Sequence, residues 1–134
     1  MDQDVRWWQR FTNFRWALEN LEKAAIQDSY NDLERQGLIK GFELCHELAW
    51  KTLQDVLRER GYDGIAGPKP AIRQAFLDGL ISDGDLWGQL HEARNLAAHT
   101  YDLERAILLE GEIKAKYLSA FQQLRARLEG IKDQ

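Results

Sequence analysis

The sequence LIKGFELCHELAWKTLQDV, residues 38–56, decides the fold class of this chain. Its apolar side chains recur at steps of three and four residues, which is the period of one helix face and not the two-residue alternation of a strand. The positions on this stripe are Leu38, Phe42, Cys45, Ala49, Leu53 and Val56. The segment therefore predicts a long amphipathic helix, which begins after the turn residues Asp28, Ser29 and Asn31 and ends near Arg60.

The same periodicity continues on both sides of this segment. It predicts further helices over about residues 4–26, 69–78, 83–99 and 102–129. Residues 61–70 hold three glycines and both prolines of the chain, so they are expected to form a connection. We therefore expect one all-α domain over residues 1–134, an antiparallel up-down four-helix bundle with an additional short helix.

The composition limits the classes of function. With 134 residues the chain fits one domain, and its net charge of −4 excludes a global basic field that would attract nucleic acid non-specifically. No apolar run approaches the roughly 20 residues that cross a bilayer, and the N-terminus lacks a signal-peptide core, so we expect a cytoplasmic protein without a membrane segment. The single cysteine, Cys45, is expected to be a buried apolar residue. No metal-ligand spacing or cofactor motif is found.

The five tryptophans of the chain predict an assembly. They are Trp7, Trp8, Trp16, Trp50 and Trp87. Since this number exceeds what one small core absorbs, we expect several of them at a subunit interface, which favours a homodimer.

The segment RNLAAHTY, residues 94–101, holds the strongest candidates for chemistry. A guanidinium can hold a phosphate through two parallel hydrogen bonds, and a histidine can transfer a proton near neutral pH. On a regular helix Asn95 and His99 share a face, whereas Arg94 lies ~140° from His99 and shares its face with Tyr101. Convergence of Arg94 and His99 therefore requires a distorted helix end or a site shared across a dimer axis. The spacing alone also fits a solvated helix edge.

Further candidates lie on the helices before this segment. Three charged residues follow one another at i, i+4 and i+8: Glu43, Glu47 and Lys51. Either they reach the Arg94 cleft as ion-pair or positioning groups, or they form an exposed helix ladder. His91 precedes Arg94 by three residues and is a candidate lining residue of the same cleft. His46 is expected at the helix surface or at an interface, and not as a metal ligand.

The R-x4-H-x-Y pattern of residues 94–101 resembles the motif that marks HEPN domains. Two further stretches, residues 37–51 and 71–81, resemble the branch known as nucleotidyltransferase substrate-binding proteins. The three blocks occur in the family's order, and the resemblance extends from about Trp7 to Phe121. It implies a dimeric helical bundle with the motifs near a shared cleft. It also implies a small nucleotidyltransferase encoded nearby as partner, in a pair that resembles a toxin and its antitoxin.

The resemblance also implies roles for the motif residues. In a metal-independent ribonuclease of this kind Arg94 would hold the scissile phosphate, and His99 would transfer a proton during attack by the ribose 2'-hydroxyl. Asn95 would orient His99 or the phosphate. Tyr101 would accept AMP groups from the partner, which silences the toxin. Two alternatives stay open: a non-catalytic module that binds a nucleotide or delivers substrate to the nucleotidyltransferase, and a structural dimer in which the motif is an interface salt-bridge cluster.

Overall fold

The computed structural model of the chain describes residues 2–98 and 102–132, and every regular element within these ranges is helical. The elements are α1 (Asp2–Ala24), α2 (Asp32–Glu59), α3 (Pro68–Leu77), α4 (Gly84–Ala97), α5 (Leu103–Glu112), a π-helical turn (Ile113–Tyr117) and α6 (Leu118–Lys132). The predicted all-helical bundle is confirmed at this level.

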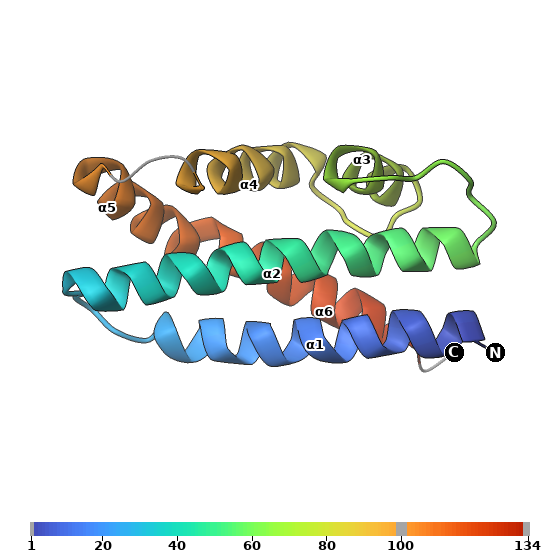
Figure 1. The fold of residues 1–134 in the computed structure, drawn as a ribbon, viewed down its shortest axis with the longest axis horizontal. Coiled ribbons are helices and arrows are strands. Elements are labelled where there is room, and N and C mark those ends of the chain that lie inside the picture. Colours follow the sequence, from blue (N-terminus) through green and yellow to red (C-terminus); the bar gives the residue numbers. More distant parts are fainter. Residues whose placement is uncertain (1, 99–101, 133–134) are drawn as a thin grey trace.

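Helix α2 lies at the centre of the arrangement and contacts α1, α3, α4 and α5. Helices α1 and α2 lie side by side and antiparallel, α3 and α4 lie on the other side of α2, and α6 crosses the α1–α2 pair obliquely (Figure 1). No helix within the described ranges combines the length and the apolar character that crossing a bilayer requires.

Side-chain caps explain why the helices begin where they do. Asn31 forms a capping box with Glu34: its side chain accepts a hydrogen bond from the Glu34 backbone N–H at 2.8 Å, and its own N–H donates to Glu34 Oε1 at 2.9 Å. Asp83 caps α4 and Asp102 caps α5 without a capping box: each side chain accepts one hydrogen bond from a backbone N–H, that of Leu86 and that of Glu104. The turn and cap chemistry predicted at Asn31 is therefore confirmed.

The predicted single helix over residues 102–129 is wrong in one respect, because a π-helical turn interrupts it at Ile113–Tyr117. Its buried positions Leu109, Ile113, Tyr117 and Phe121 are spaced four residues apart. In a regular α-helix this spacing drifts by ~40° at each step, so the stripe would rotate away from the core. The wider turn counters this drift and keeps all four side chains buried.

Aromatic packing around Phe121 joins four helices. Its ring centroid lies 6.1 Å from that of Phe14 on α1, 6.1 Å from that of Phe42 on α2 and 5.8 Å from that of Trp87 on α4. Cys45 is fully buried beside this cluster, as predicted, and burial raises the pKa of its thiol to about 12.

The tryptophans do not support the argument for an interface. Trp7 and Trp87 are buried in the core, and Trp8 and Trp50 are partly buried. Only Trp16, with 61% of its surface exposed, is left at the surface. The core absorbs more of this aromatic area than we expected, because the rings pack on one another: Trp7 contacts both Trp8 and Phe11.

Candidate functional site

The candidate site lies where the C-terminal half of α4 packs against α2. Arg94 and Asn95 belong to the last turn of α4, which ends at Ala97, and both side chains are half-buried. His99 and Tyr101 lie outside the described residues, so the structure locates only the first part of the segment 94–101. The described part of the site consists of Arg94, Asn95 and the residues around them.

Two histidines meet in the contact between α2 and α4. His46 Nε2 lies 3.1 Å from His91 Nδ1, and the two rings are stacked with centroids 5.2 Å apart. His46 is 1% exposed and His91 is 7% exposed. The prediction that His46 lies at the surface or at an interface is therefore wrong, because α4 covers the side of α2 that carries it.

A hydrogen bond extends this pair to the motif. Asn95 Nδ2 lies 3.3 Å from His91 Nε2. With the Asn95 amide as donor, His91 carries its proton on Nδ1 and donates it to His46 Nε2. His46 then keeps its own proton on Nδ1, which is buried and has no hydrogen-bond partner among the described residues. The result is a continuous polar chain from the α2 side of the core to Asn95.

The histidine pair is held in its neutral form. Burial lowers the pKa of His46 to about 4, with smaller contributions in the same direction from His91 and Arg94. Burial also lowers the pKa of His91, and the positive charges of Lys69 and Arg94 act in the same direction, whereas Glu92 opposes them. At neutral pH the pair thus fixes the orientation of the Asn95 amide without adding positive charge.

Arg94 brings an incompletely bonded cation to this cluster. Its Nε is buried and makes no hydrogen bond to a described residue. Glu47 on α2 lies within electrostatic range, but it forms its ion pair with Lys51 at 3.0 Å and accepts a hydrogen bond from Trp50 Nε1 at 3.2 Å. These bonds and the charge of Arg94 together outweigh burial and lower the pKa of the Glu47 carboxyl.

The charged ladder on α2 consists of Glu43, Glu47 and Lys51. Lys51 and Glu47 form the predicted ladder pair, and Lys51 also lies over the Trp50 ring, 5.7 Å from its centroid. Glu43 is half-buried and shows no hydrogen bond or ion pair with a described residue. Of this charged ladder, Glu47 therefore lies in the surroundings of Arg94.

The sequence pattern around His46 is consistent with its burial, although His46 does not belong to the apolar stripe of α2. His46 lies one residue after the buried Cys45 and four after the buried Phe42, so it belongs to the edge of a wider buried face. His91 has the same relation to Leu90 and Trp87 on α4. Two histidines beside buried positions on two helices predict a buried pair only when the helices are known to cross there.

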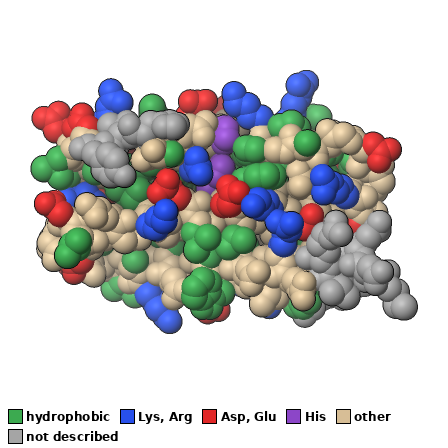
Figure 2. All heavy atoms as spheres, viewed as in Figure 1, with side chains coloured by type: hydrophobic (Ala, Val, Ile, Leu, Met, Phe, Trp, Pro, Cys, Tyr) green, Lys and Arg blue, Asp and Glu red, His purple; other side chains and the backbone are tan. Residues whose placement is uncertain are grey.

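The surface around the cluster carries charges of both signs. On the face drawn in Figure 2, the described basic and acidic side chains alternate, and histidine side chains lie between them. No broad basic area forms there. The described ranges also contain no group of three or more histidine, cysteine or carboxylate side chains that could share a metal ion.

Comparison with known proteins identifies the family. Residues 9–130 match the family described as nucleotidyltransferase substrate binding protein like. The chain belongs to this family. Within the nucleotidyltransferase substrate-binding proteins, a probable ribonuclease HepT from Haemophilus influenzae is 32% identical over 98 residues, which are 68% of this chain and 67% of that protein.

Two solved structures share the fold of this substrate-binding family member. A protein from Thermus thermophilus matches with a TM-score of 0.78 and 33% identity, over 86% of this chain and 98% of its own. HI0074 from Haemophilus influenzae matches with a TM-score of 0.79 and 27% identity, over 89% of this chain and 98% of its own. The HI0074 structure is described as the fold of a substrate binding domain of a nucleotidyltransferase. The resemblance to the HEPN superfamily and to this branch is thereby confirmed.

Proposed function

We propose that this chain is the HEPN-type subunit of a two-component, toxin–antitoxin-like system and that it cleaves RNA without a metal ion. One observation carries the proposal: the buried Nε of Arg94 has no described hydrogen-bond partner and lies beside an Asn95 that the neutral histidine pair holds in place. The relative named probable ribonuclease HepT supports this activity. A single domain over residues 1–134 and a cytoplasmic location complete the proposal.

The proposed reaction is an internal transesterification. Arg94 holds the non-bridging oxygens of the scissile phosphate, and His99 takes the proton from the ribose 2'-hydroxyl. The 2'-oxygen attacks phosphorus, the bond to the 5'-oxygen breaks, and the departing oxygen takes a proton from the solvent. The products are a 2',3'-cyclic phosphate and a free 5'-hydroxyl. In this scheme Asn95 orients the phosphate or His99, and the histidine pair supports Asn95.

A homodimer completes the site in this proposal. A groove of about 410 Å³ lies between α4 and α5, and its lining includes the exposed Leu96 and Leu108. Leu103 and Ile107 are further exposed apolar residues of α5. Pairing of two copies through these residues would bring both segments 94–101 to one cleft, so Arg94 and His99 could act together across the dimer axis. The fold that we propose for each subunit is an antiparallel up-down bundle of four long helices, in which α5 and α6 together form the fourth.

The proposed protein partner is a small nucleotidyltransferase encoded nearby. It would transfer AMP from ATP to the Tyr101 hydroxyl, forming the phosphodiester and releasing pyrophosphate. The added phosphate places negative charge beside the cleft that must receive RNA, so the modified dimer would be inactive. This step predicts a mass increase by AMP units with partner and ATP, absent from Tyr101→Phe.

A second function has support from HI0074, which is described as a substrate binding domain of a nucleotidyltransferase. In this alternative the same cleft binds a nucleotide or presents substrate to the partner, and Arg94 binds phosphate without cleavage. In a third alternative the protein is a structural dimer, and the motif forms a cluster of salt bridges at its interface.

RNA cleavage by protein freed of metal with a chelator separates these functions. We expect the wild type to leave 2',3'-cyclic phosphate ends and His99→Ala to lose about 100-fold or more in rate, since general base catalysis contributes roughly that factor. Arg94→Ala should lose a comparable factor, while Lys40→Ala, an exposed cation on α2, should keep full activity. Absence of cleavage by well-folded wild type would favour the binding module.

A further inference from the structure

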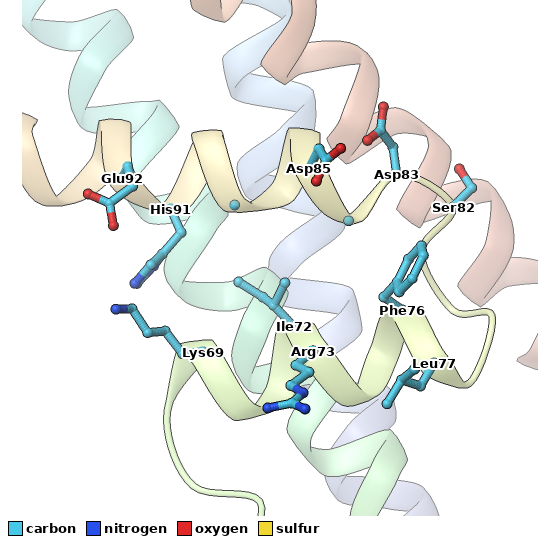
Figure 3. Close-up of a pocket in the computed structure, with 12 residues that line it drawn as sticks. Lys69, Ile72, Arg73, Phe76, Leu77, Ser82, Asp83, Asp85, His91 and Glu92 are labelled. Carbon is cyan, nitrogen blue, oxygen red and sulfur yellow. The ribbon is translucent and has the colours of Figure 1, made fainter.

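A groove lies between α3 and α4 (Figure 3). Its volume is about 670 Å³, within the range of roughly 300–1,000 Å³ that ligand sites occupy. His91 belongs to both sites, because it lines this groove and also hydrogen-bonds Asn95. Arg94 follows His91 by less than one helical turn, so the groove leads along α4 toward the motif.

The α3 side of the groove carries two cations without partners among the described residues. Lys69 and Arg73 are four residues apart and therefore share a face of α3. Neither forms a hydrogen bond or an ion pair with a described residue, and Lys69 extends toward His91 from the opposite helix (Figure 3). Two unpaired cations one turn apart suit a phosphate group.

An aromatic ring lies on the same side. Phe76 is 47% exposed and borders the groove together with the buried Ile72, one turn before it on α3. Part of the ring rests against the backbone of Gly84, where an added Cβ would lie 3.3 Å from the ring carbons. The remaining ring surface is open and offers a stacking platform for a nucleobase.

Gly88 gives the groove its depth on the α4 side. A Cβ added at this position would meet nothing within 4 Å, so no close packing contact requires a glycine there. Glycine in a helix interior is less favourable than alanine, because it loses more backbone freedom on folding. A larger side chain at this position would point into the groove and leave the rest of α4 undisturbed.

The acidic residues of the groove orient its ligand. Asp83, Asp85 and Glu92 all belong to the α4 side, and Asp83 is already engaged as the cap of α4. Their charges repel phosphates from α4, and their oxygens can accept hydrogen bonds from ribose hydroxyls or base amino groups. A ligand therefore places its phosphate at α3.

We propose that this groove binds one ribonucleotide unit of an RNA strand, with the phosphate at Lys69 and Arg73 and the base against Phe76. The inference rests on the proposed function, because the groove holds the strand that continues to Arg94. A free nucleotide shares the same chemistry, so the length of the ligand distinguishes the two sources.

The test uses fluorescence anisotropy with a labelled hexa-adenylate whose riboses are 2'-O-methylated. This probe cannot be cleaved through its 2'-oxygen, so binding is measured apart from cleavage. Gly88→Leu fills the groove and should weaken binding about tenfold or more, by excluding a stacked base. Gly37→Leu is the matched control, since Gly37 is an exposed glycine within α2 whose added Cβ also meets nothing within 4 Å.

The cations are tested in the same assay. The double variant Lys69→Ala/Arg73→Ala should bind more weakly and reduce the salt dependence of binding by about one phosphate contact, because both cations hold the same phosphate. Lys40→Ala/Arg58→Ala removes the same charge from exposed positions on α2 and should leave the salt slope near that of the wild type.

The binding measurements either support or overturn RNA binding in the groove between α3 and α4. Wild-type binding that Gly88→Leu abolishes and Gly37→Leu preserves supports the groove, even if no RNA is cleaved, in which case only the ribonuclease proposal fails. Equal binding by wild type and Gly88→Leu, or no binding by wild type, overturns it. Binding of ATP with the same affinity as the hexamer, and the same sensitivity to Gly88→Leu, overturns the assignment to an RNA strand.

Discussion

His46 and His91 place two ionisable rings 3.1 Å apart between α2 and α4. A pair in this position is stable while both rings are neutral, because one nitrogen then donates and the other accepts. Protonation of His46 would leave two donors facing each other between the rings, and protonation of His91 would turn its Nε2 into a donor that faces the Asn95 amide. Either change would place a charge in the core. The residues that support Asn95 thus make the fold sensitive to acid.

This sensitivity predicts a pH dependence of stability. An unfolded histidine has a pKa of about 6.5, whereas burial lowers that of folded His46 to about 4. Between these two pKa values the unfolded chain binds more protons than the folded chain. The contribution of neutral His46 to the free energy of unfolding is therefore fully present above pH 6.5, and it is lost as the pH falls toward 4. The loss attributable to His46 should reach about 3 kcal/mol.

Urea unfolding of wild type and His46→Gln from pH 7 to pH 4 measures this contribution. The carboxylates titrate in both proteins and cancel in the difference. We expect the wild type to lose stability relative to the variant as the pH falls. Parallel curves would show that His46 does not titrate in the way proposed.

At the scale of single helices, α2 depends on a local device at its first turn. The capping box of Asn31 and Glu34 satisfies two backbone N–H groups that a helix start would otherwise leave unpaired. Asn31→Ala should therefore lower the free energy of unfolding by about 1 kcal/mol. Ser29→Ala, two residues before the cap, should change it by less than about 0.5 kcal/mol. Equal effects of both substitutions in urea unfolding would contradict the capping argument.

The π-helical turn shows how an element adapts to its neighbours. Its residues 113–117 fit the helical apolar pattern, and no proline, glycine or charge run marks an interruption there. The turn instead keeps Ile113 and Tyr117 buried, and the Tyr117 ring stacks on that of Phe42 on α2 with the two centroids 5.5 Å apart. Tyr117 also donates a hydrogen bond to Glu112, and burial raises its pKa.

For the whole molecule, the exposed apolar residues of α5 predict the assembly. Leu108 is 65% exposed and lies on the face that the proposed homodimer would bury. Leu108→Asp should convert a dimer to a folded monomer, because a carboxylate would lose its hydration at the interface. Leu33→Asp, at a still more exposed leucine on α2, is the control and should remain dimeric.

Sedimentation velocity measures the oligomeric state of the wild type and of both variants, and circular dichroism on the same samples measures their helix content. A monomeric wild type at micromolar concentration would contradict the homodimer, and a dimeric Leu108→Asp would show that another face is used. Unchanged helicity in the variant distinguishes loss of assembly from loss of folding.

The sequence by itself determined the helices, the start of α2 at Asn31, and the family, because these depend on local periodicity and on residues close together in the chain. It also brought Arg94 and Asn95 into one candidate site. Only the tertiary structure decided that His46 is buried against His91, that Glu47 lies within electrostatic range of Arg94, and that α3 and α4 leave a groove at Gly88. Each of these depends on where two helices cross, and packing between residues far apart in the chain sets that crossing.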